Sequence, residues 1–223
     1  MKTAILVDAS FFIIRYKQIF STNLTGSTGL TGTDIANALF KHCKKHIYRD
    51  KDELFRIYVY DSEPSAKKVH YPISHKSLDF KKSSQYLERT DFHNQIKKLP
   101  NFALRLGFLD DKYGEWEFKS SKIIKELINK TKTIDDLTDD DFKYSYKQKG
   151  VDIKIGLDIA TLAYKRFVDK IVLITADSDF VPAIKHARRE GLFIQLDPMH
   201  HPIKPDLLEH IDRLKSAISA PKT

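Results

Sequence analysis

Aspartates close the four clearest apolar runs of the chain. They are Asp8, Asp61, Asp177 and Asp197, and Asp179 follows one residue beyond the third of them. Carboxylates held close together repel each other unless a cation lies between them or one of them takes up a proton. An all-oxygen ligand set suits Mg²⁺ or Mn²⁺, which keep several waters and also bind substrate phosphates. The aspartates therefore predict a divalent-metal site, provided that the fold brings them together.

The competing interpretation is structural, because Asp often ends a strand by starting a turn or capping a helix. A single such residue favours that interpretation, whereas four of them favour a site. Thr175 and Ser178 add hydroxyl groups beside the last acidic pair, and these can hydrogen-bond the carboxylates or a phosphate oxygen. Pro182 stands where a helix can begin, and a helix N-terminus would add positive potential there.

The elements that must position these acids alternate along the chain. Short apolar runs rich in β-branched residues are typical of strands buried on both faces, and they occur at 3–8, 54–61, 170–177 and 192–197, with 102–109 as a fifth candidate. Helical spacing or caps predict helices at 31–48, 151–167, 181–191 and 206–218. This alternation predicts an α/β fold with a mainly parallel sheet, in which sites form at the carboxyl ends of the strands.

Length and composition indicate one globular domain over residues 1–223, with a less regular, insertion-rich region at about 62–150. Lys and Arg number 38 against 30 Asp and Glu, a net charge of +8 that favours an anionic partner such as nucleic acid but also occurs on ordinary surfaces. The single cysteine, Cys43, rules out an intramolecular disulfide. No segment approaches 18 uninterrupted apolar residues. We therefore expect a cytoplasmic protein without a membrane span.

Four segments together resemble the NYN domain, most closely its LabA-like branch (also labelled DUF88), within the PIN-like nuclease superfamily. They are ILVDAS, IYVYDSEP, KGVDIKIGLDIATLA and VLITADSDFVPAIKHARREGLFIQL, and they span residues 3 to 197. The resemblance implies a three-layer α/β/α sandwich whose acidic cluster binds Mg²⁺ or Mn²⁺ and hydrolyses phosphodiester bonds. It also implies a nucleic-acid partner, RNA rather than DNA, and is compatible with a homo-oligomer.

The resemblance also implies roles for individual residues. The implied catalytic acids and metal ligands are Asp8, Asp152, Asp177 and Asp179, with Asp158 as a further metal ligand. Asp152 and Asp158 are six residues apart on one predicted helix and so point about 120° away from each other. We therefore rank Asp152 above Asp158.

The stretch DASFF, residues 8–12, departs from the family pattern. Many members carry an Asn a few residues after the first acid, whereas Ser10 stands here. Ser10 can replace the missing hydrogen bond or leave the site weakened. The chain is predicted to be a metal-dependent ribonuclease, with a catalytically weak RNA-binding or regulatory module as the alternative. Residues expected to support the site are Ser10, Asp61, Thr175 and Ser178.

A basic segment, residues 65–86, follows the second strand and interleaves lysines with aromatic residues. Lysines would contact phosphates, and aromatic rings could stack on unpaired bases. A solvated insertion with inward-packed aromatics fits the same pattern equally well. The predicted substrate-binding residues are Lys67, Lys68, Lys81, Lys82 and Lys149.

Two further motifs are less favoured. HCKKH, residues 42–46, places two histidines at i and i+4 but lacks a second ligand pair for zinc, which favours an ordinary helix surface. ITADSDFV also fits an aspartyl-phosphate phosphatase, with Asp177 as nucleophile and Asp179 as general acid/base. That motif normally opens its domain, whereas only residues 180–223 follow it here.

Overall fold

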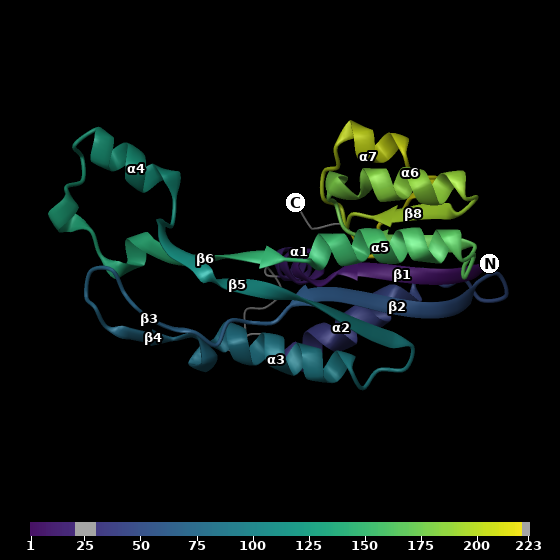
Figure 1. Cartoon of the computed structure of the whole chain (residues 1–223), viewed down its shortest axis with the longest axis horizontal. Helices are drawn as coiled ribbons and strands as arrows, with labels where there is room; N and C mark the ends of the chain where they lie inside the picture. The colour runs from purple at the N-terminus through teal and green to yellow at the C-terminus, as the bar shows by residue number, and fades with distance from the viewer. Residues whose placement is uncertain (21–29, 220–223) are drawn as a thin grey trace.

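A seven-stranded sheet in the order β6-β5-β2-β1-β7-β8-β9 crosses the part of the molecule that the structure describes, residues 1–20 and 30–219 of a computed structural model (Figure 1). The strands are β1 (Lys2–Asp8), β2 (Glu53–Ser62), β5 (Phe102–Phe118), β6 (Phe142–Lys149), β7 (Lys170–Ile174), β8 (Phe193–Asp197) and β9 (Arg213–Leu214). Every pairing in this sheet is parallel except that of β5 with β6. The predicted α/β fold with a mainly parallel sheet is confirmed.

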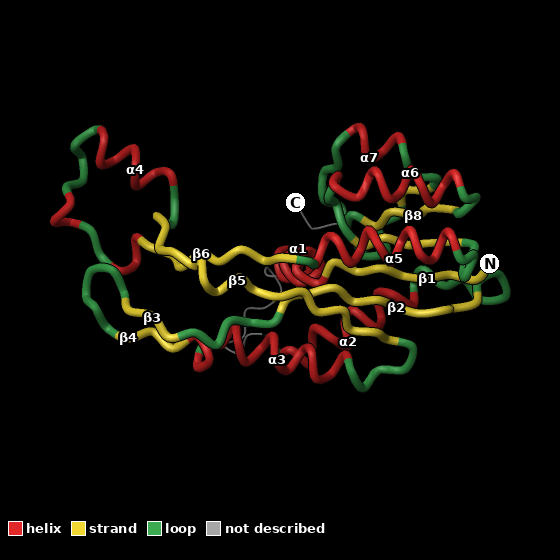
Figure 2. The backbone as a smooth tube through the Cα atoms, in the orientation of Figure 1, coloured by secondary structure: helices red, strands yellow, loops and turns green. Residues whose placement is uncertain are grey.

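Helices cover both faces of the sheet (Figure 2). One face carries α1 (Ala9–Phe20), α2 (Gly32–Lys44) and α3 (Ser84–Ile96), and the other carries α5 (Val151–Tyr164), α6 (Val181–Arg189) and α7 (Pro205–Glu209). Because side chains alternate across a strand, β1 supplies both cores. Ile5 and Val7 pack towards α1–α3, and Ala4 and Leu6 pack towards α5–α7.

The interval 62–150, for which a less regular, insertion-rich region was expected, contains α3 and an arm that extends beyond the body of the molecule (Figures 1 and 2). We define the arm as residues 66–82 and 109–148. It comprises the hairpin β3 (Lys68–His70) and β4 (Ser77–Asp79), the short helix η2 (Phe80–Lys82), the outer parts of β5 and β6, and α4 (Ser121–Ile128). Strand β5 pairs with β2 as far as Ser62 and Gly107 and then continues to Phe118. The arm therefore projects from the carboxyl edge of the parallel strands.

Half-buried aromatic rings pack the two hairpins of the arm together. The ring centroids of Tyr71 and Trp116 are 5.3 Å apart, and those of Trp116 and Tyr144 are also 5.3 Å apart. Phe80 lies 5.5 Å from Tyr144 and 5.7 Å from Tyr146. Contacts of this kind stabilise offset or edge-on pairs beyond their buried area.

The predicted final helix, 206–218, is wrong. Helix α7 ends at Glu209, and the chain then adds β9 to the edge of the sheet. Asp212 explains the change, because its carboxylate accepts a hydrogen bond from the Ile194 backbone N–H at 2.8 Å and pairs with Arg188 at 2.9 Å. These tertiary contacts override the helical pattern. Helix α1, which was not predicted, forms directly after β1.

Candidate active site

The carboxyl edge of the sheet brings together acids from distant parts of the chain. Asp8 ends β1, and its Oδ1 accepts a hydrogen bond from the Phe11 N–H at 3.0 Å, which holds the start of α1. Strand β7 pairs with β1 as far as Ile174, three residues earlier than predicted. The chain then turns at Asp177, whose Oδ1 accepts from the Asp179 N–H at 2.9 Å. Both acids of the DSD stretch thus follow the strand beside Asp8.

Two glycines allow Asp152 to lie at the same edge of the sheet. Strand β6 returns from the arm, and Gly150 with φ of 82° turns the chain into α5 in a conformation that disfavours other residues. At Gly107 on β5, a Cβ would lie 2.7 Å from both the Lys149 carbonyl oxygen and Val151 Cγ2. The missing side chain lets the start of α5 approach the sheet, which places Asp152 in the first turn.

The pKa values show that these acids lie within one another's field. Burial, together with the charges of Asp152 and Asp61, raises the pKa of Asp8 to about 6, although the backbone hydrogen bond from Phe11 opposes the shift. Burial also raises the pKa of Asp152, with additional contributions from Asp177 and Asp179. A concentration of negative charge at one partly buried edge favours a bound cation.

The donor set fits a hard divalent cation, with one restriction on geometry. Carboxylate oxygens are the ligands that Mg²⁺ and Mn²⁺ prefer. Within residues 1–20 and 30–219, no three of the carboxylates of Asp8, Asp152, Asp177 and Asp179 bring their oxygens within 4.8 Å of one another. The arrangement therefore suits an ion that keeps several of its waters, rather than one enclosed by protein ligands.

The residues predicted to support the edge have definite partners. Asp61 is buried and accepts from Arg89 at 2.8 Å, from His93 at 2.7 Å and from the Ser10 hydroxyl at 3.5 Å. It is thus engaged by cationic or hydrogen-bonding groups on α3 and links them to the start of α1.

The turn after β7 is also fixed by hydrogen bonds. The Thr175 hydroxyl is buried and accepts from the Asp177 N–H at 3.2 Å. The Ser178 hydroxyl accepts from the Lys204 ammonium at 3.1 Å. Sequence reasoning missed Lys204, because nothing in its local pattern shows that the loop after β8 passes this turn.

Comparison with known proteins identifies the family. The sequence profile of the NYN domain matches residues 2–203, which is most of the chain. The chain belongs to the NYN family. A crystal structure of a protein of unknown function from Vibrio parahaemolyticus is similar at 12% sequence identity and a TM-score of 0.44, covering 96% of this chain and 91% of that one. No protein with a curated description matches.

Membership of the NYN family places the chain in the PIN-like nuclease superfamily, as the sequence predicted. Within the described residues, no helix of this NYN domain is long and apolar enough to cross a membrane.

Asp158 lies on α5 with Asp152 but has different neighbours. Its Oδ2 accepts from the Tyr60 hydroxyl at 2.7 Å and lies 3.3 Å from Arg105 Nε. These partners stand on β2 and β5, beneath the helix. The carboxylate is therefore satisfied by the sheet of the NYN domain, and the charges that raise the pKa of Asp152 come from Asp177 and Asp179 instead.

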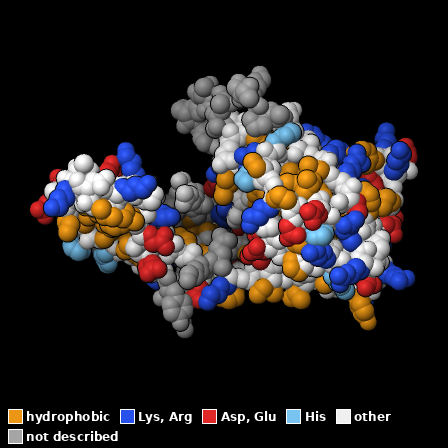
Figure 3. All heavy atoms as spheres, turned by 90° about the horizontal axis from the view of Figure 1, so that it is seen from above, with side chains coloured by type: hydrophobic (Ala, Val, Ile, Leu, Met, Phe, Trp, Pro, Cys, Tyr) orange, Lys and Arg blue, Asp and Glu red, His pale blue; other side chains and the backbone are white. Residues whose placement is uncertain are grey.

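The predicted substrate lysines are distributed over the arm and its base. Lys67 donates to the Tyr144 hydroxyl at 3.1 Å, Lys68 lies 3.7 Å from Asp79, and Lys149 pairs with Asp110. Lys81 and Lys82 are exposed on η2. Figure 3 shows the arm as a lobe beside the body, with a narrower waist between them.

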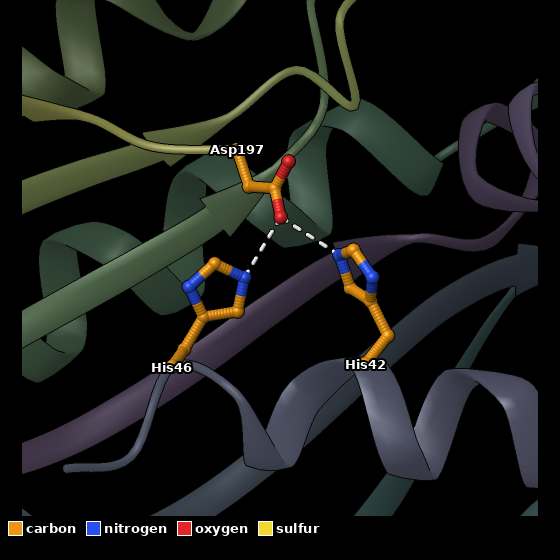
Figure 4. Close-up of side chains that lie close together, drawn as sticks. All are labelled: His42, His46 and Asp197. Carbon is orange, nitrogen blue, oxygen red and sulfur yellow. Dashed lines mark hydrogen bonds and ion pairs between the residues drawn. The ribbon is translucent and has the colours of Figure 1, made fainter. Parts of the chain in front are cut away.

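The prediction of an ordinary helix surface for HCKKH is wrong. His42 and His46 are buried, and both Nε2 atoms point to Oδ2 of Asp197, at 2.7 and 2.8 Å (Figure 4). The Gln195 amide nitrogen lies 2.7 Å from His46 Nδ1. Since that nitrogen can only donate, Nδ1 accepts, and the proton of neutral His46 is on Nε2 and is donated to Asp197. Asp197 thus joins α2 to β8 instead of entering the acidic edge.

Metal coordination does not fit this His–Asp cluster. Ligands about 2.0–2.1 Å from a tetrahedral zinc are roughly 3.3 Å apart, well beyond the observed separations. The same Asp197 oxygen also accepts from the Ala217 N–H at 3.1 Å, and the other accepts from the Met199 N–H at 2.8 Å. Burial alone would raise the pKa of Asp197, but the hydrogen bonds and charges of His42 and His46 hold it well below its usual range. The cluster is a buried hydrogen-bonded junction between α2, β8 and the C-terminal segment.

Proposed function

We propose that this NYN protein is a metal-dependent ribonuclease that hydrolyses phosphodiester bonds at the carboxyl edge of its sheet. The observation that carries the proposal is the placement of acids from β1, the DSD turn and the first turn of α5 at one edge of the sheet. Burial, with added repulsion from Asp152 and Asp61, raises the pKa of Asp8 to about 6, and the charges of Asp177 and Asp179 help to raise the pKa of Asp152. Carboxylates can hold a metal ion that activates a water, so the proposed hydrolysis needs no side-chain nucleophile. The nuclease superfamily of the NYN domain supports the same reaction class.

The chain's own groups have separable roles in this proposal. Asp8, Asp152, Asp177 and Asp179 would hold Mg²⁺ or Mn²⁺, which when bound activates a water and offsets the charge that develops on the phosphate. The Asp179 N–H fixes the Asp177 carboxylate by bonding one of its oxygens. Asp8 must lose its proton before it can act as a ligand, and burial delays that loss to a pH of about 6.

Lys204 is the cation that we assign to the scissile phosphate. Its ammonium lies 3.1 Å from the Ser178 hydroxyl, between the two acids of the DSD turn in sequence, and its side chain is exposed. A phosphate approaching the acidic edge needs a positive group to offset repulsion by the carboxylates. Lys81 and Lys82 would contact phosphates further along the strand.

The test is a cleavage assay with Mg²⁺ or Mn²⁺ on labelled RNA and DNA. We expect RNA cleavage that EDTA stops and that Asp177→Asn lowers by about 100-fold or more, since removing groups that merely orient metal ligands already costs about 10- to 100-fold. Asp158→Asn is the matched control, because this carboxylate is satisfied by Tyr60 and Arg105. Equal cleavage by purified wild type and Asp177→Asn would exclude the proposal.

The second candidate is a catalytically weak RNA-binding module. It is favoured by Ser10 in place of the family's Asn and by the separation of the carboxylate oxygens. Tight RNA binding without Mn²⁺-dependent cleavage would support it over the nuclease. Either activity suits the cytosol, which we propose as the location because the single cysteine, Cys43, is buried and unpaired.

A further inference from the structure

A pocket of about 310 Å³ opens beside the acidic edge, between α1, α3 and the root of the arm. Its floor includes Ser62, which ends β2 directly after Asp61. Ile13 and Lys17 of α1 form one side of it. The volume is within the range of about 300–1,000 Å³ that is typical of small-molecule sites. The pocket is therefore large enough for a ligand and adjoins the elements that carry Asp8 and Asp61.

Three half-buried aromatic rings line the pocket, each from a different element. Phe80 comes from η2, Tyr86 from α3 and Tyr146 from β6. Phe80 and Tyr146 meet edge to face, with centroids 5.7 Å apart and planes at 79°. Because the rings are anchored by separate elements, they present fixed flat surfaces, which suit a flat ligand that can stack.

Both cations that line the pocket are paired with carboxylates, which makes it unsuited to a phosphate. Lys17 lies 2.7 Å from Glu88, and Arg89 lies 2.8 Å from Asp61. Gln85, exposed on the first turn of α3, offers an amide that can both donate and accept hydrogen bonds. Aromatic walls, paired charges and an amide together favour a neutral, planar, hydrogen-bonding group.

We propose that this pocket binds one unpaired nucleobase of the substrate strand, next to the phosphate at the acidic edge. The proposal rests on the proposed function, because it supplies the substrate with a position for its base. A base within a duplex cannot enter such a pocket without leaving its stack, so the pocket selects single-stranded RNA. The series of aromatic rings continues outward along the arm, from Tyr146 to Tyr144 at 5.6 Å and on to Trp116. This series gives the RNA strand a path along the arm.

The test measures binding separately from cleavage. The anisotropy of a short fluorescent single-stranded RNA is recorded with the Asp177→Asn protein, into which Tyr86→Ala is then introduced. Stacking contributes about 1–3 kcal/mol per base, so we expect binding weakened about 5- to 150-fold. Tyr86→Phe should retain the affinity, because the ring remains. Tyr164→Ala on α5, a residue 70% exposed outside the pocket, is the control for loss of a tyrosine.

Abasic substitution in the RNA provides a measurement that needs no change in the pocket. A strand lacking one base at a time should lose affinity chiefly at one position, and that loss should disappear in Tyr86→Ala because the same contact is already missing. A uniform loss at every position, or an unchanged affinity in Tyr86→Ala, would overturn the pocket. A free nucleoside monophosphate that binds as tightly as the RNA strand would also overturn the proposal that the pocket binds a base of the substrate strand.

The outcomes separate this inference from the proposed function. If the wild type cleaves RNA but neither abasic substitution nor Tyr86→Ala weakens binding, the nucleobase-binding proposal is wrong and the nuclease proposal is retained. If RNA binds with the expected dependence on Tyr86 but no metal supports cleavage, the nucleobase-binding proposal is retained and the nuclease proposal is wrong. Duplex RNA that binds as well as the single strand excludes the pocket in either case.

Discussion

Asp8→Asn should stabilise the metal-free protein at neutral pH although it removes a proposed catalytic group. The pKa of Asp8 is raised from 3.8 to about 6, which at 1.36 kcal/mol per pKa unit corresponds to about 3 kcal/mol. Asn keeps an Oδ1 that can accept the hydrogen bond from the Phe11 N–H. The substitution therefore removes the buried charge while retaining the contact that holds the start of α1.

The sign of the effect follows from the raised pKa. Below pH 3.8, Asp8 is protonated in both the folded and the unfolded chain, and its favourable contribution to stability is fully present. As the pH rises towards 6, the unfolded chain has lost this proton while the fold retains it, and the contribution is lost. The advantage of Asp8→Asn should therefore be absent below pH 4 and reach up to about 3 kcal/mol above pH 6.

Urea unfolding followed by circular dichroism, in EDTA between pH 4 and pH 8, measures this difference. Adding Mn²⁺ at pH 7 should reverse the order, because an ion at 1,000 times its Kd stabilises the wild type by about 4.1 kcal/mol. The variant gains less, because it has lost one of the proposed ligands. Asp158→Asn should gain from Mn²⁺ as the wild type does. The reasoning is refuted if Asp8→Asn is less stable than wild type in EDTA at pH 7, or if Mn²⁺ stabilises both equally.

Three further predictions concern other parts of the structure. Asp197→Asn should lower the free energy of unfolding by about 3–5 kcal/mol, because it removes the charge at the centre of a buried hydrogen-bonded cluster. Zinc and chelators should leave the melting temperature of the wild type unchanged, and stabilisation by zinc would contradict the assignment of this cluster as hydrogen-bonded. Gly107→Ala should lower the free energy of unfolding by about 1–3 kcal/mol and weaken Mn²⁺ binding, because the added Cβ would lie 2.7 Å from Lys149 and Val151. Calorimetry measures the first effect and metal titration the second. An unchanged Mn²⁺ affinity would show that this contact does not position Asp152. Lys204→Ala should raise KM for RNA about tenfold or more, because a charge-assisted hydrogen bond contributes roughly 1.5–3 kcal/mol; an unchanged KM would exclude the phosphate contact.

The sequence was sufficient wherever a pattern is local. Apolar runs located β1, β2, β7 and β8, and a capping box located α2, whose Thr31 and Asp34 do bond each other's backbone. The resemblance implied both Asp152 and Asp158, and helical geometry, which points the two side chains apart, led to the ranking of Asp152 above Asp158. The charge of Asp152 raises the pKa of Asp8, whereas Asp158 bonds to Tyr60 and Arg105. The assignment of these acids as ligands stays a prediction until metal binding is measured.

The features that could not be predicted from the sequence depend on contacts between residues that are far apart along the chain. His42 and His46 look like surface residues until Asp197, more than 150 positions away, is seen to face them. The final helix failed because Asp212 is satisfied by Ile194 and Arg188 instead of by its own turn. The arm also has no local signal, because its direction comes from the antiparallel return of β6 along β5.

The return of β6 makes the arm and the acidic edge mechanically dependent on each other. Asp152 stands three residues after the last residue of the strand that leaves the arm, across the left-handed turn at Gly150. A force on the arm is therefore transmitted through the backbone to the first turn of α5. A chain of this construction cannot exchange its arm as an independent module, because any insertion or deletion there must preserve the contact of Lys149, at the end of β6, with Gly107.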